Sequence, residues 1–181
     1  MDVGVVVEER RWSAILTAGI LAGLVAGVAL ALAQALISLA QGSGILGPFR
    51  LVASLMLGER AFAPDESVAL LVGSGLVIHF VLAVVFGLLF VWLLALFFQL
   101  SARSSLLVLY GLLYGFLLFE VNFLAVLPLL FPKLVPRFGI TALLWRGIVC
   151  YSLVYGPVLG MMMARLRPGL RADWTREGAL R

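Results

Sequence analysis

The stretch Ser13–Ala40, SAILTAGILAGLVAGVALALAQALISLA, contains no charged side chain over 28 residues. About 20 consecutive apolar residues suffice for a helix to cross a bilayer, so this stretch is long enough to span one. Three further runs share its apolar character, at 68–100, 104–131 and 138–166. A cleaved signal peptide ending near residue 33 is the alternative for the first run, and it is disfavoured because the apolar stretch continues beyond that point. The sequence therefore predicts four membrane-spanning helices.

The composition supports the same class of protein. Hydrophobic residues make up 64% of the 181 residues and charged residues 12%, whereas apolar residues are roughly 45–50% of a typical soluble domain. Backbone groups in lipid must be hydrogen-bonded within the membrane, and barrel strands would be about half as long as these runs. We therefore expect an all-α membrane protein, a four-transmembrane-helix bundle that forms one domain over residues 1–181.

The connection between the first two runs contains its own short helical pattern. Pro48 suits the first turn of a helix and Gly58 suits a helix stop, which predicts a helix over 48–58. Arg50 and Ser54 share one face of it, while apolar side chains cover the rest. We expect this helix to lie at the outer interface of the membrane. A re-entrant segment is the alternative, and it would require a buried partner for Arg50.

Basic residues next to membrane spans set the orientation of the chain, and an excess of them marks the cytoplasmic side. Eight lie at the two termini and the second connection, against four in the other two connections: Arg10, Arg11, Arg103, Arg165, Arg167, Arg171, Arg176 and Arg181 against Arg50, Arg60, Lys133 and Arg137. Both termini are therefore predicted to be cytoplasmic. This use of the basic charge gives no reason to expect nucleic acid as a partner.

Small residues recur at four-residue intervals in the spans, which places them on one helix face and lets a neighbouring backbone approach closely. They are predicted to be helix-packing positions: Gly19, Gly23, Gly27, Gly75, Ala83, Gly87, Gly156 and Gly160. Together they offer more close-packing surface than a four-helix monomer obviously needs, which favours association with other subunits.

Three ionisable residues, His79, Glu120 and Arg146, form a candidate intramembrane polar cluster. At 1.5 Å per residue they lie about 16, 16 and 12 Å below the outer ends of three helices. One interpretation is structural, with a buried Glu120–Arg146 pair and a hydrogen-bonded His79 fixing the helix register. The other is a proton or ion path in which Glu120 or His79 changes protonation. The structural interpretation is favoured, because membrane depth holds no second carboxylate.

Metal, cofactor and disulfide chemistry is not expected. The chain has one histidine and one cysteine, Cys150, which lies inside the fourth run. One chain therefore offers neither an intrachain disulfide nor the ligand set of a zinc site or a bis-histidine haem. Cys150 is predicted to be a small core residue, and we expect no catalytic residue and no enzymatic activity.

Four segments carry a resemblance to a known family: the glycine repeat 19–27, Pro48–Ala53 (PFRLVA), Ile78-His79-Phe80 and Val85-Phe86-Gly87. Their arrangement resembles the small four-helix bacterial inner-membrane proteins of the YagU kind. The resemblance implies a multi-pass protein of the bacterial inner membrane whose activity is unsettled. It transfers no functional residue to this chain.

These observations favour an accessory, assembly or scaffold subunit of a larger membrane complex, in contact with the lipid bilayer and with other membrane-protein subunits or itself. The alternative is a homo-oligomeric channel or transporter that uses the level of His79, Glu120 and Arg146. A membrane enzyme has the least support, since only those three residues are available for chemistry.

Overall fold

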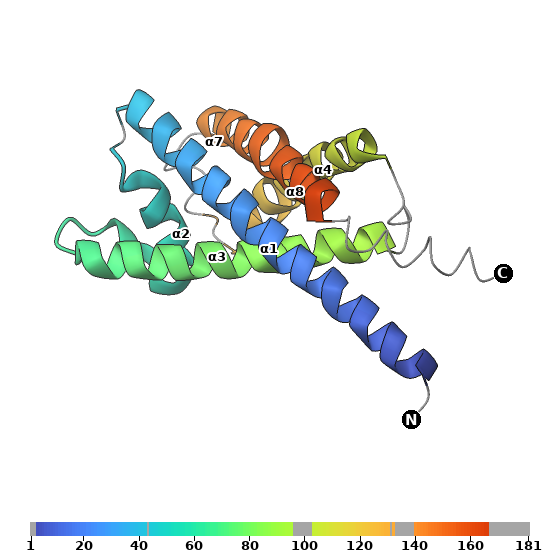
Figure 1. Cartoon of the computed structure of the whole chain (residues 1–181). Helices are drawn as coiled ribbons and strands as arrows, with labels where there is room; N and C mark the ends of the chain where they lie inside the picture. Colours follow the sequence, from blue (N-terminus) through green and yellow to red (C-terminus); the bar gives the residue numbers. More distant parts are fainter. Residues whose placement is uncertain (1–2, 43, 96–102, 131, 133–139, 167–181) are drawn as a thin grey trace.

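A computed structural model describes residues 3–42, 44–95, 103–130, 132 and 140–166 (Figure 1). The described residues are mostly helical and contain no strand. Four of the helices are long and apolar enough to cross a membrane: Trp12–Ala40, Val68–Leu93, Ser104–Leu129 and Leu144–Leu166. The predicted all-α bundle with four such helices is confirmed, and its insertion into a membrane stays a prediction.

Ten helical elements follow one another along the described chain. The first half contains α1 (Val3–Ala40), α2 (Gly47–Leu57), the 3₁₀ helix η1 (Gly58–Phe62) and α3 (Val68–Leu93). The third span consists of α4 (Ser104–Phe119), the π-helix η3 (Glu120–Val126) and α5 (Leu127–Leu130). The fourth consists of α7 (Ile140–Gly147), the π-helix η4 (Ile148–Tyr155) and α8 (Gly156–Leu166). The predicted run ends at 96–100, 131 and 138–139 lie outside the described residues, as do Lys133 and Arg137.

Local signals in the sequence set the helix ends around α2. Pro48 lies in its first turn, and Gly58 follows its last residue with a φ of 59°, a conformation that glycine adopts without steric cost. The next span starts at Ser67, whose hydroxyl accepts a hydrogen bond from the Leu70 amide at 3.5 Å. The structure thus has a helix at Gly47–Leu57, and the interfacial helix that the sequence predicts over 48–58 stays a prediction.

The connection after α2 folds back onto that helix. Nη1 of Arg50 donates hydrogen bonds to the carbonyl oxygens of Ala61 and Ala63, at 2.9 and 3.1 Å. Ala61 is also fully buried, in a small cluster with Ala53 of α2 and Leu71 of α3. α2 is thus fixed against α3, and the backbone of the connection supplies a partner for the Arg50 guanidinium.

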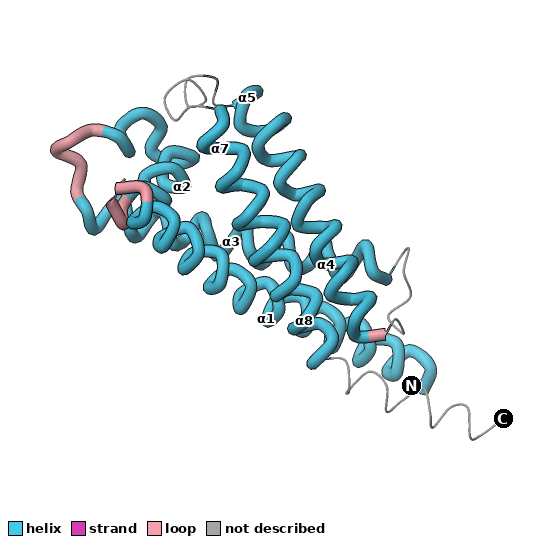
Figure 2. Tube along the Cα trace, turned by 90° about the horizontal axis from the view of Figure 1, so that it is seen from above, coloured by secondary structure: helices cyan, strands magenta, loops and turns pink. Residues whose placement is uncertain are grey.

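The spans pack as two pairs that meet in one core. α1 crosses α3, α4 lies against α8, and α1 also contacts α8 and η4 (Figures 1 and 2). Buried side chains from all four spans form a single cluster, which includes Ala22, Phe90, Leu107 and Tyr155. Large apolar side chains such as Leu36 and Val77, 66% and 65% exposed, cover the outward faces. Outward apolar faces of this kind suit a lipid environment.

The small residues lie where neighbouring backbones come closest. A Cβ atom at Gly23 would lie 2.5 Å from the carbonyl oxygen of Ala83, and one at Gly87 would meet the backbone of Gly19 and Gly23. Gly75 instead faces α2, where its Cβ would lie 3.0 Å from the carbonyl oxygen of Phe49.

The second helix pair makes the same kind of contact. Gly156 lies against Gly111 of α4, and Gly160 lies against Leu107 of the same helix. All eight predicted packing positions therefore have close neighbours within this chain. They do not form the surplus packing surface that the sequence suggests.

The π-helices η3 and η4 each end two residues before a proline. η3 precedes Pro128 and η4 precedes Pro157, and the residue after each π-helix donates its amide five residues back, to Asn122 and Tyr151. Proline lacks an amide hydrogen and clashes with the carbonyl four residues earlier, and a wider turn relieves both problems. The third helix continues past Pro128 through α5 and reaches Leu130, inside the predicted run 104–131. Near Pro157 the fourth span accommodates the proline through η4 in the same way.

Candidate functional site

His79 ties α3 to α1. Its Nε2 lies 2.8 Å from the carbonyl oxygen of Gly27, and its ring meets that of Phe80 edge to face, with the centroids 5.3 Å apart. A carbonyl oxygen only accepts hydrogen bonds, so Nε2 carries the hydrogen and donates it. His79 thus faces another helix, and it has a hydrogen bond of the kind that its structural interpretation requires.

Two tyrosines attach the other helices to α3. Tyr114 of α4 donates its hydroxyl to the carbonyl oxygen of Phe86 at 2.8 Å, and Tyr155 of η4 donates to that of Ala83 at 2.9 Å. Tyr155 is completely buried. These tyrosines were not among the residues predicted from the sequence, although a phenol hydroxyl inside a membrane span needs an acceptor.

Glu120 and Arg146, for which the sequence predicts a pair, are both half-buried. Arg146 lines a cavity, whereas neither Glu120 nor His79 is among the residues that line it. The three ionisable residues are thus on three helices, as predicted, and Arg146 alone of the three faces the cavity. The sequence gives their depth and leaves the rotation of each helix undetermined.

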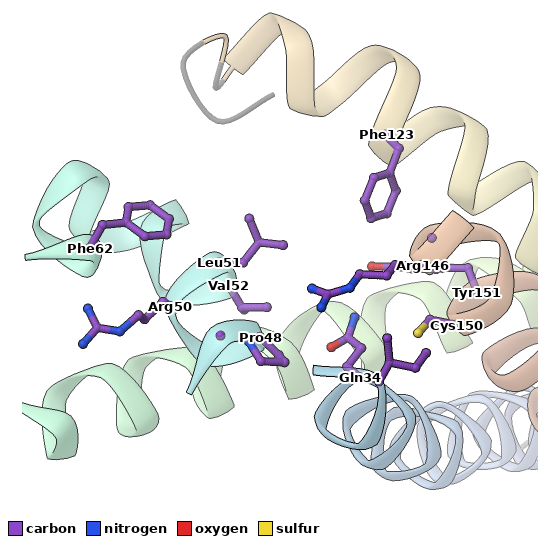
Figure 3. A pocket seen from close by; sticks show the side chains of 13 residues that line it. Gln34, Pro48, Arg50, Leu51, Val52, Phe62, Phe123, Arg146, Cys150 and Tyr151 are labelled. Atoms are coloured by element: carbon purple, nitrogen blue, oxygen red, sulfur yellow. The ribbon is translucent and has the colours of Figure 1, made fainter. Parts of the chain in front are cut away.

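The cavity that contains Arg146 has a volume of about 240 Å³ and lies between the α1–α2 side and the α7–η4 side of the bundle (Figure 3). Six helical elements contribute to its lining: Gln34 and Ile37 of α1, Gly47, Pro48, Arg50, Leu51 and Val52 of α2, Phe62 of η1, Phe123 of η3, Arg146 and Gly147 of α7, and Cys150 and Tyr151 of η4.

The two arginines of the lining point in different directions. Figure 3 shows the Arg146 side chain extending into the cavity toward the Gln34 amide. In the same view Arg50 points away from the cavity, in keeping with its bonds to Ala61 and Ala63. Arg146 is therefore the cation that faces the interior of the cavity.

Both π-helices border this space, through Phe123 of η3 and through Cys150 and Tyr151 of η4. Such wide turns interrupt α-helices frequently at functional sites. Cys150 is 2% exposed, and it belongs to the core cluster as predicted. Arg146 was among the residues predicted from the sequence, but no pattern in the sequence indicates that Gln34 faces it.

Metal chemistry finds no support in the part of the chain that the structure describes. There, no group of three or more histidine, cysteine, aspartate or glutamate residues is close enough to hold a metal ion. Among the described lining residues the cavity offers a guanidinium, an amide, a thiol and a phenol, and no carboxylate. This set can bind an anion or a hydrogen-bonding group, and it contains no acid–base pair of the usual catalytic kind.

Comparison of the chain with models of protein families, with curated proteins and with solved structures gives no match.

Proposed function

We propose that this chain is a non-enzymatic, multi-pass membrane protein that acts as an accessory, assembly or scaffold subunit of a larger membrane complex. The proposal rests on the hydrogen bonds that the polar side chains at membrane depth make to neighbouring helices. His79, Tyr114 and Tyr155 each donate to a backbone carbonyl of a neighbouring helix. Groups committed in this way stiffen a bundle, and a stiff bundle with apolar outer faces is suited to docking against other membrane helices.

The transporter alternative has weaker support. It requires His79, Glu120 and Arg146 to act at one level, yet only Arg146 lines the cavity and His79 is bonded to Gly27. Transport of ions or protons needs polar groups that face a shared path across the membrane. Enzymatic turnover is disfavoured on similar grounds.

The proposal extends to location and orientation, namely the bacterial inner membrane with both termini in the cytoplasm. It rests on the excess of arginine at the termini and on the resemblance to the YagU kind of protein. In Figure 2 the start of α1 and the end of α8 lie at the same end of the bundle, which agrees with an even number of crossings. Reporter domains fused after Arg181 and inserted after Asp65 should give opposite signals, and equal signals would contradict this topology.

Site-specific cross-linking in native membranes tests the subunit proposal. A photoreactive residue at Leu36 of α1, Val77 of α3 or Leu113 of α4, which are 66%, 65% and 55% exposed, should capture a distinct membrane protein from at least one face. The same residue at Leu159, which is fully buried, is the matched control and should capture nothing.

Purification in mild detergent completes the test. The captured protein should co-purify at a fixed stoichiometry with the unmodified chain. A closed homo-oligomer with ion flux in reconstituted vesicles would favour the transporter instead. The subunit proposal would be refuted if the chain is monomeric in the native membrane and none of the three exposed positions captures a partner.

A further inference from the structure

The cavity lies at the depth where head groups meet acyl chains, if the four helices span a bilayer. The apolar segment Trp12–Ala40 has 29 residues, which is about 43 Å at 1.5 Å per residue, against a hydrocarbon core of about 30 Å. About 6 or 7 Å of helix therefore extends beyond the core at each end. Gln34 is six residues, or about 9 Å, before the end of α1, and Arg146 is equally far from the start of α7.

The charge of the cavity selects the sign of a ligand. Its described lining includes two arginines and no acidic residue. Arg146 extends into the space, and the Gln34 amide lies across from it (Figure 3). A guanidinium presents a planar fork of donors that matches the two oxygens of a carboxylate or phosphate, and it keeps its charge at any ordinary pH. Because it has five N–H donors, it can bind such an oxyanion while it makes other contacts.

The rest of the lining is apolar and comes from both sides of the cavity. Leu51 and Val52 of α2 face Phe123 of η3 across the space. A volume of about 240 Å³ is far above the roughly 10–15 Å³ that one water needs, and it is somewhat below the roughly 300–1,000 Å³ of pockets that enclose drug-sized ligands. The cavity thus suits a head group and the first part of a chain, with the remainder of the chain in the lipid.

We propose that this cavity binds an acyl-chain amphiphile with an oxyanion head group, held by Arg146 and Gln34 with the start of its chain against Leu51, Val52 and Phe123. The oxyanion is the carboxylate of a fatty acid or the phosphate of an anionic phospholipid. This inference goes beyond the proposed function, because it requires no protein partner.

Ligand-dependent stabilisation of the full chain in neutral detergent micelles tests the inference. Oleate and phosphatidylglycerol are the two anionic test ligands. The one that raises the unfolding temperature of the chain identifies the source of the oxyanion. Oleyl alcohol and phosphatidylcholine match their chains without the net negative charge, and inorganic phosphate supplies the oxyanion without a chain. Native mass spectrometry should find one anionic amphiphile retained per chain.

Three variants locate the effect. Arg146→Gln removes the charge and should weaken binding by about tenfold or more, since hydrogen bonds to charged groups are strong. Arg165→Gln removes an exposed arginine in the last turn of α8 and should leave binding unchanged. Val52→Phe keeps every charge and narrows the cavity, so it should also abolish the stabilisation, and it keeps the test decisive if Arg146→Gln fails to fold.

Several results would overturn the inference. The inference is wrong if neither oleate nor phosphatidylglycerol stabilises the chain. It is also wrong if oleyl alcohol stabilises the chain as much as oleate does, because the charge would then be irrelevant. Equal stabilisation by inorganic phosphate would remove the need for an acyl chain. Undiminished binding in folded Val52→Phe or Arg146→Gln protein would place the ligand elsewhere.

Discussion

Replacing Gly23 by alanine should force α1 and α3 apart. The new Cβ would lie 2.5 Å from the carbonyl oxygen of Ala83, and ordinary contact begins near 3.4 Å, so the helices must separate by about 0.9 Å at this point. Such a movement would also stretch the 2.8 Å bond between His79 and Gly27 beyond the roughly 3.2 Å limit of a good N–H···O bond.

The expected free-energy change follows from three contributions. Overpacking costs about 1–3 kcal/mol and the lost interhelical bond about 0.6 kcal/mol, while alanine is a better helix former than glycine by about 1 kcal/mol. Gly23→Ala should therefore lower the free energy of unfolding by about 0.6 to 2.6 kcal/mol. The matched control is Gly73→Ala in α3, where a Cβ would have no atom within 4 Å, and it should be neutral or stabilising.

A second pair of variants separates a side-chain clash from a backbone clash. A Cβ at Gly27 would meet the Cβ of Ala83 at 2.7 Å, so Gly27→Ala should be rescued in part by Ala83→Gly. Ala83→Gly should not rescue Gly23→Ala, whose clash is with a backbone oxygen. Unfolding in mixed micelles, followed by circular dichroism during titration with a denaturing detergent, measures each difference. Equal stability of Gly23→Ala and Gly73→Ala would refute the close contact between α1 and α3.

Three further predictions concern single hydrogen bonds and charges. Tyr155→Phe should cost about 0.6 kcal/mol and at most about 1.7 kcal/mol in the same unfolding assay, and no loss at all would mean that its bond to α3 is absent. Glu120→Gln and Arg146→Met should have additive effects in a double-mutant cycle, because Arg146 extends into the cavity and Glu120 does not line it; a coupling of several kcal/mol would indicate a buried pair. Ser67→Ala should cost about 0.5 kcal/mol, at the low end for a helix cap, because its bond to the Leu70 amide is long. A cost near 2 kcal/mol would show a stronger cap than the structure contains.

Features set by a few adjacent residues could be predicted from the sequence. Pro48 and Gly58 give the ends of α2 because each restricts or frees the backbone at its own position. The long apolar runs predict the four spans because bilayer thickness fixes their length. The four-residue spacing of His79, Ala83 and Gly87 places them on one helix face, and His79 bonds to Gly27 of the neighbouring helix α1.

Features that depend on the rotation of separate helices could not be predicted. Residue depth suggested a pair between Glu120 and Arg146, yet depth says nothing about the direction in which each side chain points. For the same reason, the sequence did not predict that Gln34 and Arg146 face each other across the cavity. The π-helix before Pro128 was not predicted either, because the general rule for proline in helices does not include the wide turn by which a membrane helix keeps its backbone bonded around it.

The π-helix η4 also determines which side of the fourth span faces the third span. Gly147 faces Phe119 and Gly156 faces Gly111, so two glycines nine residues apart both lie against the third span. Nine residues at about 3.6 per turn make two and a half turns, which would put these glycines on opposite sides of an uninterrupted α-helix. The wider turns of η4 contain more residues each, which removes the extra half turn. One face of the fourth span can thus follow its neighbour along the whole crossing while Arg146 still points into the cavity.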